Sequence, residues 1–260
     1  MSPFSRAAVL VGGIVAMLYC VVCVVLYLGQ RSLLYHPMVE SQSQHAQAMR
    51  LERDGGVSLK IWEVARPGDR AVIYFGGNGD DVAWFVDDFA RAFPDRSIYL
   101  VNYRGYAGST GFPTEKALLA DAEAVFDNVH ASHSDVAVIG RSLGSGVAVY
   151  LAGVRDVHKL VLVTPYDSIE RLAEAQFAWI PVSWILEDKF DSLDRAKKVR
   201  SPVLVLMAEH DTVVPRASTD RLLAAFAARQ AEAKTIAATD HNSIVSSADY
   251  LREIAAFLRN

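Results

Sequence analysis

The sequence predicts an α/β protein with a mainly parallel central sheet flanked by helices and preceded by a membrane-spanning helix. Three observations lead to this fold class. Short runs rich in Val and Ile alternate with longer segments of helical periodicity. Several of these runs are apolar at every position, as are strands that a parallel sheet buries on both faces. The third observation is an uncharged run from Ala7 to Leu28, which is long enough to cross the hydrocarbon core of a bilayer.

The composition limits the function classes. A chain of 260 residues suits one α/β domain with a short appendage. The net charge is −4 and no basic tract is present, so we expect no nucleic-acid partner. The two cysteines, Cys20 and Cys23, both lie in the uncharged run. The remainder of the chain therefore has neither a disulfide framework nor a cysteine-based metal site.

The uncharged run is interpreted as an uncleaved anchor, and a cleaved signal peptide is the alternative. The run is longer than the apolar core of most signal peptides, and no A-x-A-like site follows it. Arg6 and Arg31 flank it almost symmetrically. The short segment before the run favours a periplasmic or luminal position for the large domain. We expect an anchor over residues 1–30, a connector and start of the domain over 31–57, and the main α/β domain over 58–260.

The strand and helix segments alternate along the domain. Polar residues from Gln42 to Arg53 are expected to form a connector or a first turn. Strands are predicted at Leu59–Val64, Ala71–Phe75, Ile98–Asn102, Val136–Ile139, Leu160–Val163 and Val203–Met207, and a weaker one at Lys234–Ala238. Helices are predicted at Val82–Phe93, Thr114–Ala131, Ser142–Val154, Ser168–Phe177, Ala217–Ala228 and Ser246–Leu258. This order indicates βαβ units, whose ligands bind beyond the carboxyl ends of the strands.

The strongest chemical signal is a Gly-x-Ser-x-Gly turn between a predicted strand and a predicted helix. Ser142 is its central residue, and Gly140 and Gly144 flank it. Glycines suit a tight, strained turn that raises the serine hydroxyl above the sheet. The start of the helix also offers free N–H groups to a developing oxyanion. We therefore interpret Ser142 as a nucleophile, and a chance match at an ordinary turn is the alternative.

Two later loops supply partners for this serine. Asp211 follows the strand at Val203–Met207, and His241 follows the last weak strand. A serine needs a base to attack, and a carboxylate orients that base. The order Ser142, Asp211, His241 is the order of a known hydrolase fold. Alternative assignments are His210 as the base and Asp167 as the acid, whereas Asp240 is expected to be a surface residue.

A glycine-rich loop follows the strand at Ala71–Phe75. It contains Gly77 and Asn78, and its glycines allow close approach of the backbone to a substrate oxygen. The N–H groups of Leu143 and Asn78 are the expected oxyanion donors, with Gly77 in the same loop. The alternative is a turn without such a role. A phosphate-binding loop fits less well, because the Lys-Ser/Thr ending is missing.

These motifs together resemble the α/β-hydrolase superfamily, in particular its membrane-anchored members related to protein depalmitoylases and to bacterial anchored hydrolases. The resemblance covers nearly the whole chain. Further matching stretches are Gln30–Tyr35, Asn102–Ser109, Thr164–Ser168 and Phe190–Ser192. The chain departs from the family at Gly76, where His is usual, and at Asp240, where Gly is usual.

The resemblance and the motifs predict a serine hydrolase that cleaves carboxylic esters or thioesters through an acyl-enzyme. We expect no metal and no organic cofactor. The expected substrate is a small molecule or an acylated protein, and the resemblance to depalmitoylases implies fatty-acyl groups. A serine peptidase or aminopeptidase is one alternative, and a catalytically silent membrane-tethered binding protein is another. An apolar insertion around 177–190 is expected to form a lid or to pack over the sheet edge.

Overall fold

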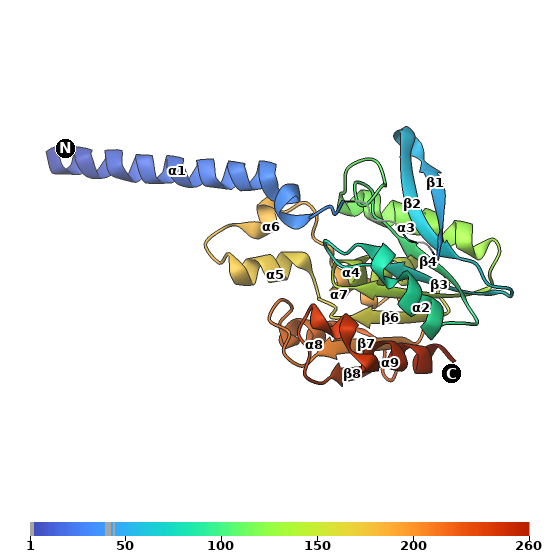
Figure 1. Ribbon diagram of the computed structural model, residues 1–260. Coiled ribbons are helices and arrows are strands. Elements are labelled where there is room, and N and C mark those ends of the chain that lie inside the picture. The colour runs from blue at the N-terminus through green and yellow to red at the C-terminus, as the bar shows by residue number, and fades with distance from the viewer. Residues whose placement is uncertain (1–2, 40–42, 44, 260) are drawn as a thin grey trace.

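An eight-stranded sheet forms the centre of the computed structural model, which describes residues 3–39, 43 and 45–259 (Figure 1). Its strand order is β1-β2-β4-β3-β5-β6-β7-β8. The strands are β1 (Gln47–Arg53), β2 (Val57–Val64), β3 (Arg70–Phe75), β4 (Ser97–Val101), β5 (Asp135–Arg141), β6 (Lys159–Val163), β7 (Val203–Ala208) and β8 (Ala231–Ile236). Strand β2 is antiparallel to β1 and β4, and all other neighbouring pairs are parallel. The predicted fold class is confirmed.

The predicted connector over Gln42–Arg53 is wrong for its second half. Residues 47–53 form strand β1, which pairs with β2 along its whole length. Met49 and Leu51 are partly buried against the core, while Arg50 between them is exposed. Side chains of β1 alternate between the core and the solvent, because β1 is an edge strand with only one buried face. This explains why its sequence is mostly polar. Gln42 itself lies outside the described residues.

The last strand also differs from its prediction. β8 runs from Ala231 to Ile236, three residues earlier than the predicted start at Lys234. Only its final residue, Ile236, is fully buried, because β8 is the other edge of the sheet. The hydrophobic pattern is therefore weak in β8, and the start predicted from it, Lys234, lies too far along the chain.

Helices cover both faces of the sheet. They are α1 (Pro3–Leu34), α2 (Val86–Ala92), α3 (Glu115–His130), α4 (Leu143–Val154), α5 (Ile169–Gln176), α6 (Val182–Ile185), α7 (Ser192–Ala196), α8 (Arg216–Ala225) and α9 (Ala248–Arg259). Phe89 of α2 and Ile254 of α9 lie in one apolar layer. Leu118 of α3, Val147 of α4 and Leu222 of α8 lie in the other. Both layers bury the Val-rich strands of the middle of the sheet.

Helix α1 projects away from the sheet, and α5 and α6 lie beneath its C-terminal half (Figure 1). It contains no buried residue and is long and apolar enough to cross a membrane. The helix continues to Leu34, past the end predicted for the anchor at residue 30. The uncharged run is therefore joined to the domain without a break in the helix.

Candidate active site

Ser142 lies on the sharp turn between β5 and α4. Its backbone has φ 47° and ψ −116°, a conformation that costs energy for a residue with a side chain. The neighbouring glycines are required by packing. A Cβ on Gly144 would collide with the carbonyl oxygen of Phe75, and one on Gly140 would collide with the carbonyl oxygen of Gly144. The turn is therefore held between β3 and α4, and the serine is fixed at the carboxyl edge of the sheet.

The three residues of the predicted triad meet at this edge. The Nε2 of His241 lies 2.9 Å from the Oγ of Ser142, and its Nδ1 lies 2.9 Å from Oδ2 of Asp211. The imidazole is almost completely buried, with 6% of the residue exposed. Asp211 is oriented in turn, because its Oδ1 accepts the N–H groups of Val213 and Val214 at 2.9 and 2.8 Å. The arrangement can pass a proton from the hydroxyl to the imidazole.

Asp167, the alternative acid, and Asp240, the expected surface residue, both have other roles. Asp167 is fully buried, and its carboxylate accepts hydrogen bonds from Ser218 and Arg221, each at 2.6 Å. Asp240 is exposed at the start of the histidine loop. Its Oδ1 accepts the N–H groups of Ser243 and Asn242, and these bonds lower the pKa of Asp240. Neither carboxylate is bonded to His241.

The alternative base, His210, also lies apart from Ser142. Its imidazole is exposed, and its nearest acid is Glu209 at 3.7 Å. Its backbone N–H donates to the carbonyl of Thr239, which ties the loop of Asp211 to the loop of His241.

The expected oxyanion donors differ in their availability. Within the described residues, the N–H groups of Leu143 and Asn78 donate no hydrogen bond. In contrast, the N–H of Gly77 donates to Oδ2 of Asp80 at 2.6 Å. Gly77 is therefore occupied, and it does not qualify as a third donor. A Cβ at Gly77 would lie 2.7 Å from Nη1 of Arg141, so this glycine serves close packing instead.

Sequence reasoning missed a charged pair that links three loops. Nη1 of Arg141 donates to Oδ1 and Oδ2 of Asp80 at 2.5 and 2.7 Å. Nη2 of the same guanidinium donates to the carbonyl of His241 at 3.0 Å and to Oδ1 of Asn242 at 3.1 Å. Although burial opposes its charge, Asp80 raises the pKa of Arg141. The pair ties the glycine-rich loop to the serine turn and to the histidine loop.

The side chain of Asn78 connects the glycine-rich loop to the C-terminal end of α1. Its Nδ2 donates to the carbonyl of Leu34 at 2.6 Å, and its Oδ1 accepts the N–H of His36 at 2.9 Å. Tyr106 donates to the same oxygen at 2.9 Å. The matching stretch at residues 30–35 thus has a structural role, since its end holds the loop that carries a candidate oxyanion donor.

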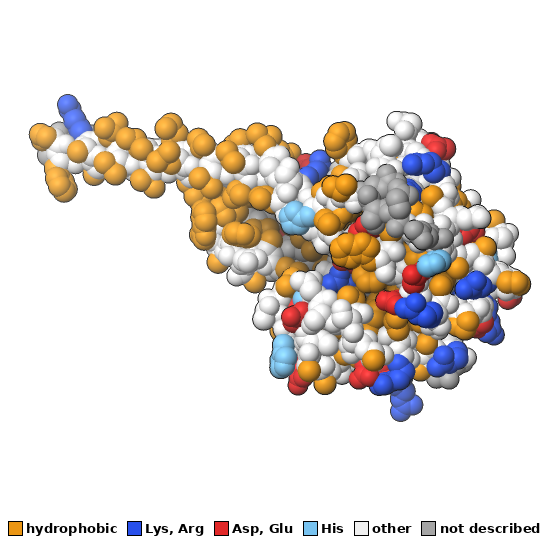
Figure 2. All heavy atoms as spheres, in the orientation of Figure 1, with side chains coloured by type: hydrophobic (Ala, Val, Ile, Leu, Met, Phe, Trp, Pro, Cys, Tyr) orange, Lys and Arg blue, Asp and Glu red, His pale blue; other side chains and the backbone are white. Residues whose placement is uncertain are grey.

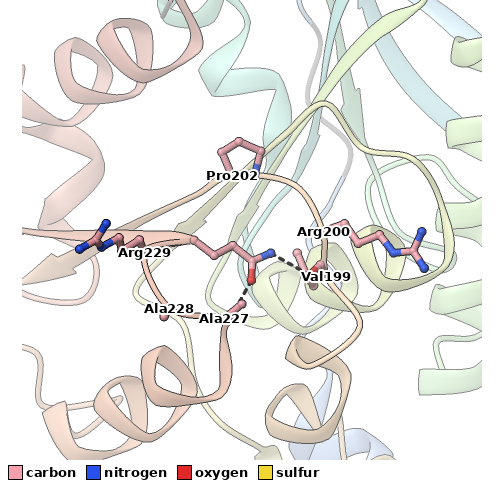
Figure 3. A pocket seen from close by; sticks show the side chains of 7 residues that line it. Val199, Arg200, Pro202, Ala227, Ala228 and Arg229 are labelled. Carbon is pink, nitrogen blue, oxygen red and sulfur yellow. Dashed lines mark hydrogen bonds between the residues drawn. The ribbon is translucent and has the colours of Figure 1, made fainter.

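A surface pocket lies at the amino ends of β7 and β8, and Figure 3 shows the side chains that line it. It is lined by residues just before β7 and β8, such as Val199, Pro202 and Ala228. Gln230 crosses it, donates to the carbonyls of Val199 and Ser201, and accepts the N–H of Ala227. Its amide is thus committed to backbone groups. The pocket faces the amino ends of the strands, away from Ser142, and we assign it no role in the chemistry.

The fold and the arrangement of Ser142, His241 and Asp211 at the carboxyl ends of the strands are typical of one class of protein, and relatives in sequence belong to the same class. The chain belongs to the α/β-hydrolase superfamily. It is 34% identical over 229 residues to the uncharacterized protein Rv2307c of Mycobacterium tuberculosis, covering 82% of this chain and 81% of that one. It is 27% identical to the lysophosphatidylserine lipase ABHD12 of Xenopus tropicalis, over 64% of this chain and 54% of the lipase. No family model matches the chain.

Solved structures show the same fold. The esterase Pf2001 of Pyrococcus furiosus superimposes with a TM-score of 0.69 at 17% identity, over 86% of this chain and 96% of the esterase. The thioesterase domain from the curacin biosynthetic pathway superimposes with a TM-score of 0.63 at 14% identity, over 83% of this chain and 99% of that domain. At this identity the likeness extends to the fold and no further.

Proposed function

We propose that the protein is a serine hydrolase that cleaves carboxylic esters or thioesters through an acyl-enzyme. Ser142 attacks the substrate carbonyl while His241 takes the hydroxyl proton. Asp211 holds the imidazole in the tautomer that presents Nε2 to the serine and stabilises the imidazolium that forms. His241 then returns the proton to the leaving alcohol or thiol. A water molecule, activated by the same imidazole, releases the acid and restores the serine.

The N–H groups of Leu143 and Asn78 are the proposed oxyanion donors. Leu143 is the first residue of α4, where no intrahelical acceptor exists for its N–H. Donors fixed before the reaction stabilise the charge that develops on the carbonyl oxygen without reorganising. The bonds of Asp80 to Gly77 and of Asn78 to the anchor segment fix the loop in advance.

The observation that carries this proposal is the continuous hydrogen-bond chain from Ser142 through His241 to Asp211, with both imidazole bonds at 2.9 Å. Ester and thioester bonds are favoured because a relative in sequence is a lysophosphatidylserine lipase and because an esterase and a thioesterase domain share the fold. A fatty-acyl substrate would also suit an enzyme whose chain carries a helix fit to cross a membrane.

The test is hydrolysis of short-chain and long-chain acyl esters and thioesters by the full-length protein in detergent micelles. We expect Ser142→Ala to lower turnover by about a thousandfold or more and to abolish labelling by a fluorophosphonate probe. Ser134→Ala is the matched control, because Ser134 is exposed just before β5, at the far edge of the sheet. Wild-type protein that is folded but neither labelled nor active would contradict the proposal.

We further propose that residues 1–30 are an anchor, that residues 31–57 are a connector and the start of the domain, and that residues 58–260 are a catalytic domain on the periplasmic or luminal side. A single cysteine introduced as Ser134→Cys, with Cys20 and Cys23 replaced by Ala, tests the side. An impermeant maleimide should label it in intact cells. Labelling only after lysis would place the domain in the cytoplasm.

A further inference from the structure

The insertion between β6 and β7 exposes an unusual amount of aromatic surface. Its tip, residues 177–186, is a run of ten residues without a charge. Trp184 is 90% exposed and Trp179 is 64% exposed, and Phe177 beside them is also exposed. Large apolar side chains gathered in one exposed patch indicate a binding surface, and tryptophan favours the boundary between lipid and water.

This tip is docked on helix α1. The hydroxyl of Tyr19 donates to the carbonyl of Trp179 at 2.8 Å. The amide of Gln30 makes two further bonds, from Nε2 to the carbonyl of Ile185 at 2.9 Å and from the N–H of Glu187 to Oε1 at 2.7 Å. These bonds fix the insertion along the C-terminal half of the helix.

The bonds of Tyr19 and Gln30 fix the position of the tip along the axis of α1. Tyr19 lies within the uncharged run of α1, and Gln30 lies just after it. The helix rises roughly 16 Å between the two residues, which is about half of a ~30 Å hydrocarbon core. At that depth, backbone carbonyls must find partners within the protein, as the carbonyl of Trp179 does in Tyr19.

Charged residues bound the tip on both sides. Glu174 precedes it, and Glu187 and Asp188 follow it. Arg31 pairs with Glu187 at 2.6 Å and with Asp188 at 3.2 Å, at the point where the uncharged run of α1 has ended. Charges therefore gather where headgroups or water would solvate them, and the segment between them has none. Figure 2 shows hydrophobic side chains continuing from α1 onto the surface beneath its C-terminal half.

We propose that the tip, residues 177–186, is immersed in the same membrane leaflet as the C-terminal half of α1, so that Trp179 and Trp184 contact lipid. The occupant of this surface is the bilayer, because the tip continues the lipid-facing surface of the anchor and is held in register with it. The insertion is thus a second membrane contact of the catalytic domain.

The immersion also indicates the source of the substrate, an inference that rests on the proposed hydrolase function. Tyr35, which follows α1, donates to Asp188 at the end of the insertion at 3.0 Å. Its neighbour His36 is bonded to Asn78 of the glycine-rich loop. The lipid-facing surface and the candidate oxyanion loop are therefore joined through two adjacent residues. We infer that the enzyme takes acyl chains directly from this leaflet.

Fluorescence of the full chain in phosphatidylcholine–phosphatidylglycerol vesicles tests the immersion. The protein has four tryptophans, so variants that keep one and carry Phe at the other three isolate each signal. Lipids brominated in the acyl chain should quench Trp179 and Trp184 at least about twofold more than Trp84, an exposed tryptophan outside the insertion. Aqueous iodide should show the reverse order. Trp179 and Trp184 quenched by iodide like Trp84, and untouched by brominated lipid, would overturn the proposal.

Activity provides a separate test of the substrate route. The double variant Trp179→Ser, Trp184→Ser should hydrolyse a long-chain ester embedded in vesicles about tenfold more slowly, while a soluble short-chain ester is hydrolysed within about twofold of wild type. Trp84→Ser should change neither rate. Equal loss on both substrates would overturn the leaflet route. Wild-type protein inactive on every ester would contradict the hydrolase proposal, and the quenching result would still decide the immersion.

Discussion

The proposed catalytic edge, which carries Ser142, Asp211 and His241, and the proposed membrane side, which comprises α1 and the insertion, are held in place by different means. At the catalytic edge, Ser142 is fixed by buried strands and by glycines that leave no room for a side chain. On the membrane side, α5 has no buried residue, and the insertion is joined to α1 by a few polar bonds. A close-packed interior resists small changes of position, whereas polar bonds outside the core can be removed one at a time. Chemistry and membrane contact should therefore be separable by mutation.

The largest expected effect is at the catalytic edge. Asp211→Asn keeps the shape of the side chain but removes the charge that orients and stabilises the imidazole. We expect a fall in kcat of about 10⁴-fold, the magnitude seen when this position is changed in a serine triad. Steady-state kinetics on a soluble ester measure it. Asp240→Asn is the control and should stay within about twofold of wild type, since Asp240 does not contact His241 through its carboxylate. A loss of less than tenfold in Asp211→Asn would remove Asp211 from the triad.

The next effect concerns the pair of Arg141 and Asp80. Lysine in place of Arg141 keeps the charge but cannot bond Asp80 and the carbonyl of His241 together. We expect kcat to fall about 10- to 100-fold with little change in KM, because small misplacement of reacting groups is costly. Arg229→Lys, at an exposed position, is the matched control. A lower melting temperature with unchanged kcat would mean that the pair only stabilises the fold.

The same comparison explains what could be predicted from sequence. Strand β7 is apolar at every position, and β5 is apolar over Val136–Ile139, so a local pattern reveals both. The serine turn is a local motif for the same reason. In contrast, β1 is buried on one face only, and its polar residues resemble a connector. The local hydrophobic pattern therefore predicts strands that are buried on both faces, and it fails for the edge strands β1 and β8.

Contacts between distant segments could not be predicted. Arg141 and Asp80 are separated by 61 positions, and a charged residue in a loop is ordinarily solvated. Tyr19 and Trp179 are separated by 160 positions. No periodicity reports such pairs, because they depend on how the finished sheet places its loops. The candidate triad could be predicted from the Gly-x-Ser-x-Gly motif and from the order of Ser142, Asp211 and His241 along the chain. The residues that position the triad could not be predicted.

A smaller effect is expected where the two regions meet. Asn78→Ala leaves the backbone N–H in place but removes the bonds to Leu34 and His36. The glycine-rich loop should then be less well fixed, and kcat should fall about tenfold. Asn128→Ala, on the exposed side of α3, should have no effect. An unchanged kcat for Asn78→Ala would show that Asp80 alone holds the loop.

The smallest effect on chemistry is expected from Gln30→Ala. This change removes two bonds to the insertion, each contributing about 1 kcal/mol, and leaves the catalytic edge untouched. Hydrogen exchange at Glu187, whose N–H donates to Gln30, should become faster, while turnover of a soluble ester stays within about twofold. Gln176→Ala, at an exposed position on α5, is the control. Faster exchange around Ser142 in the Gln30 variant would show that the membrane side and the catalytic edge open together, and the separation between the two regions would then be wrong.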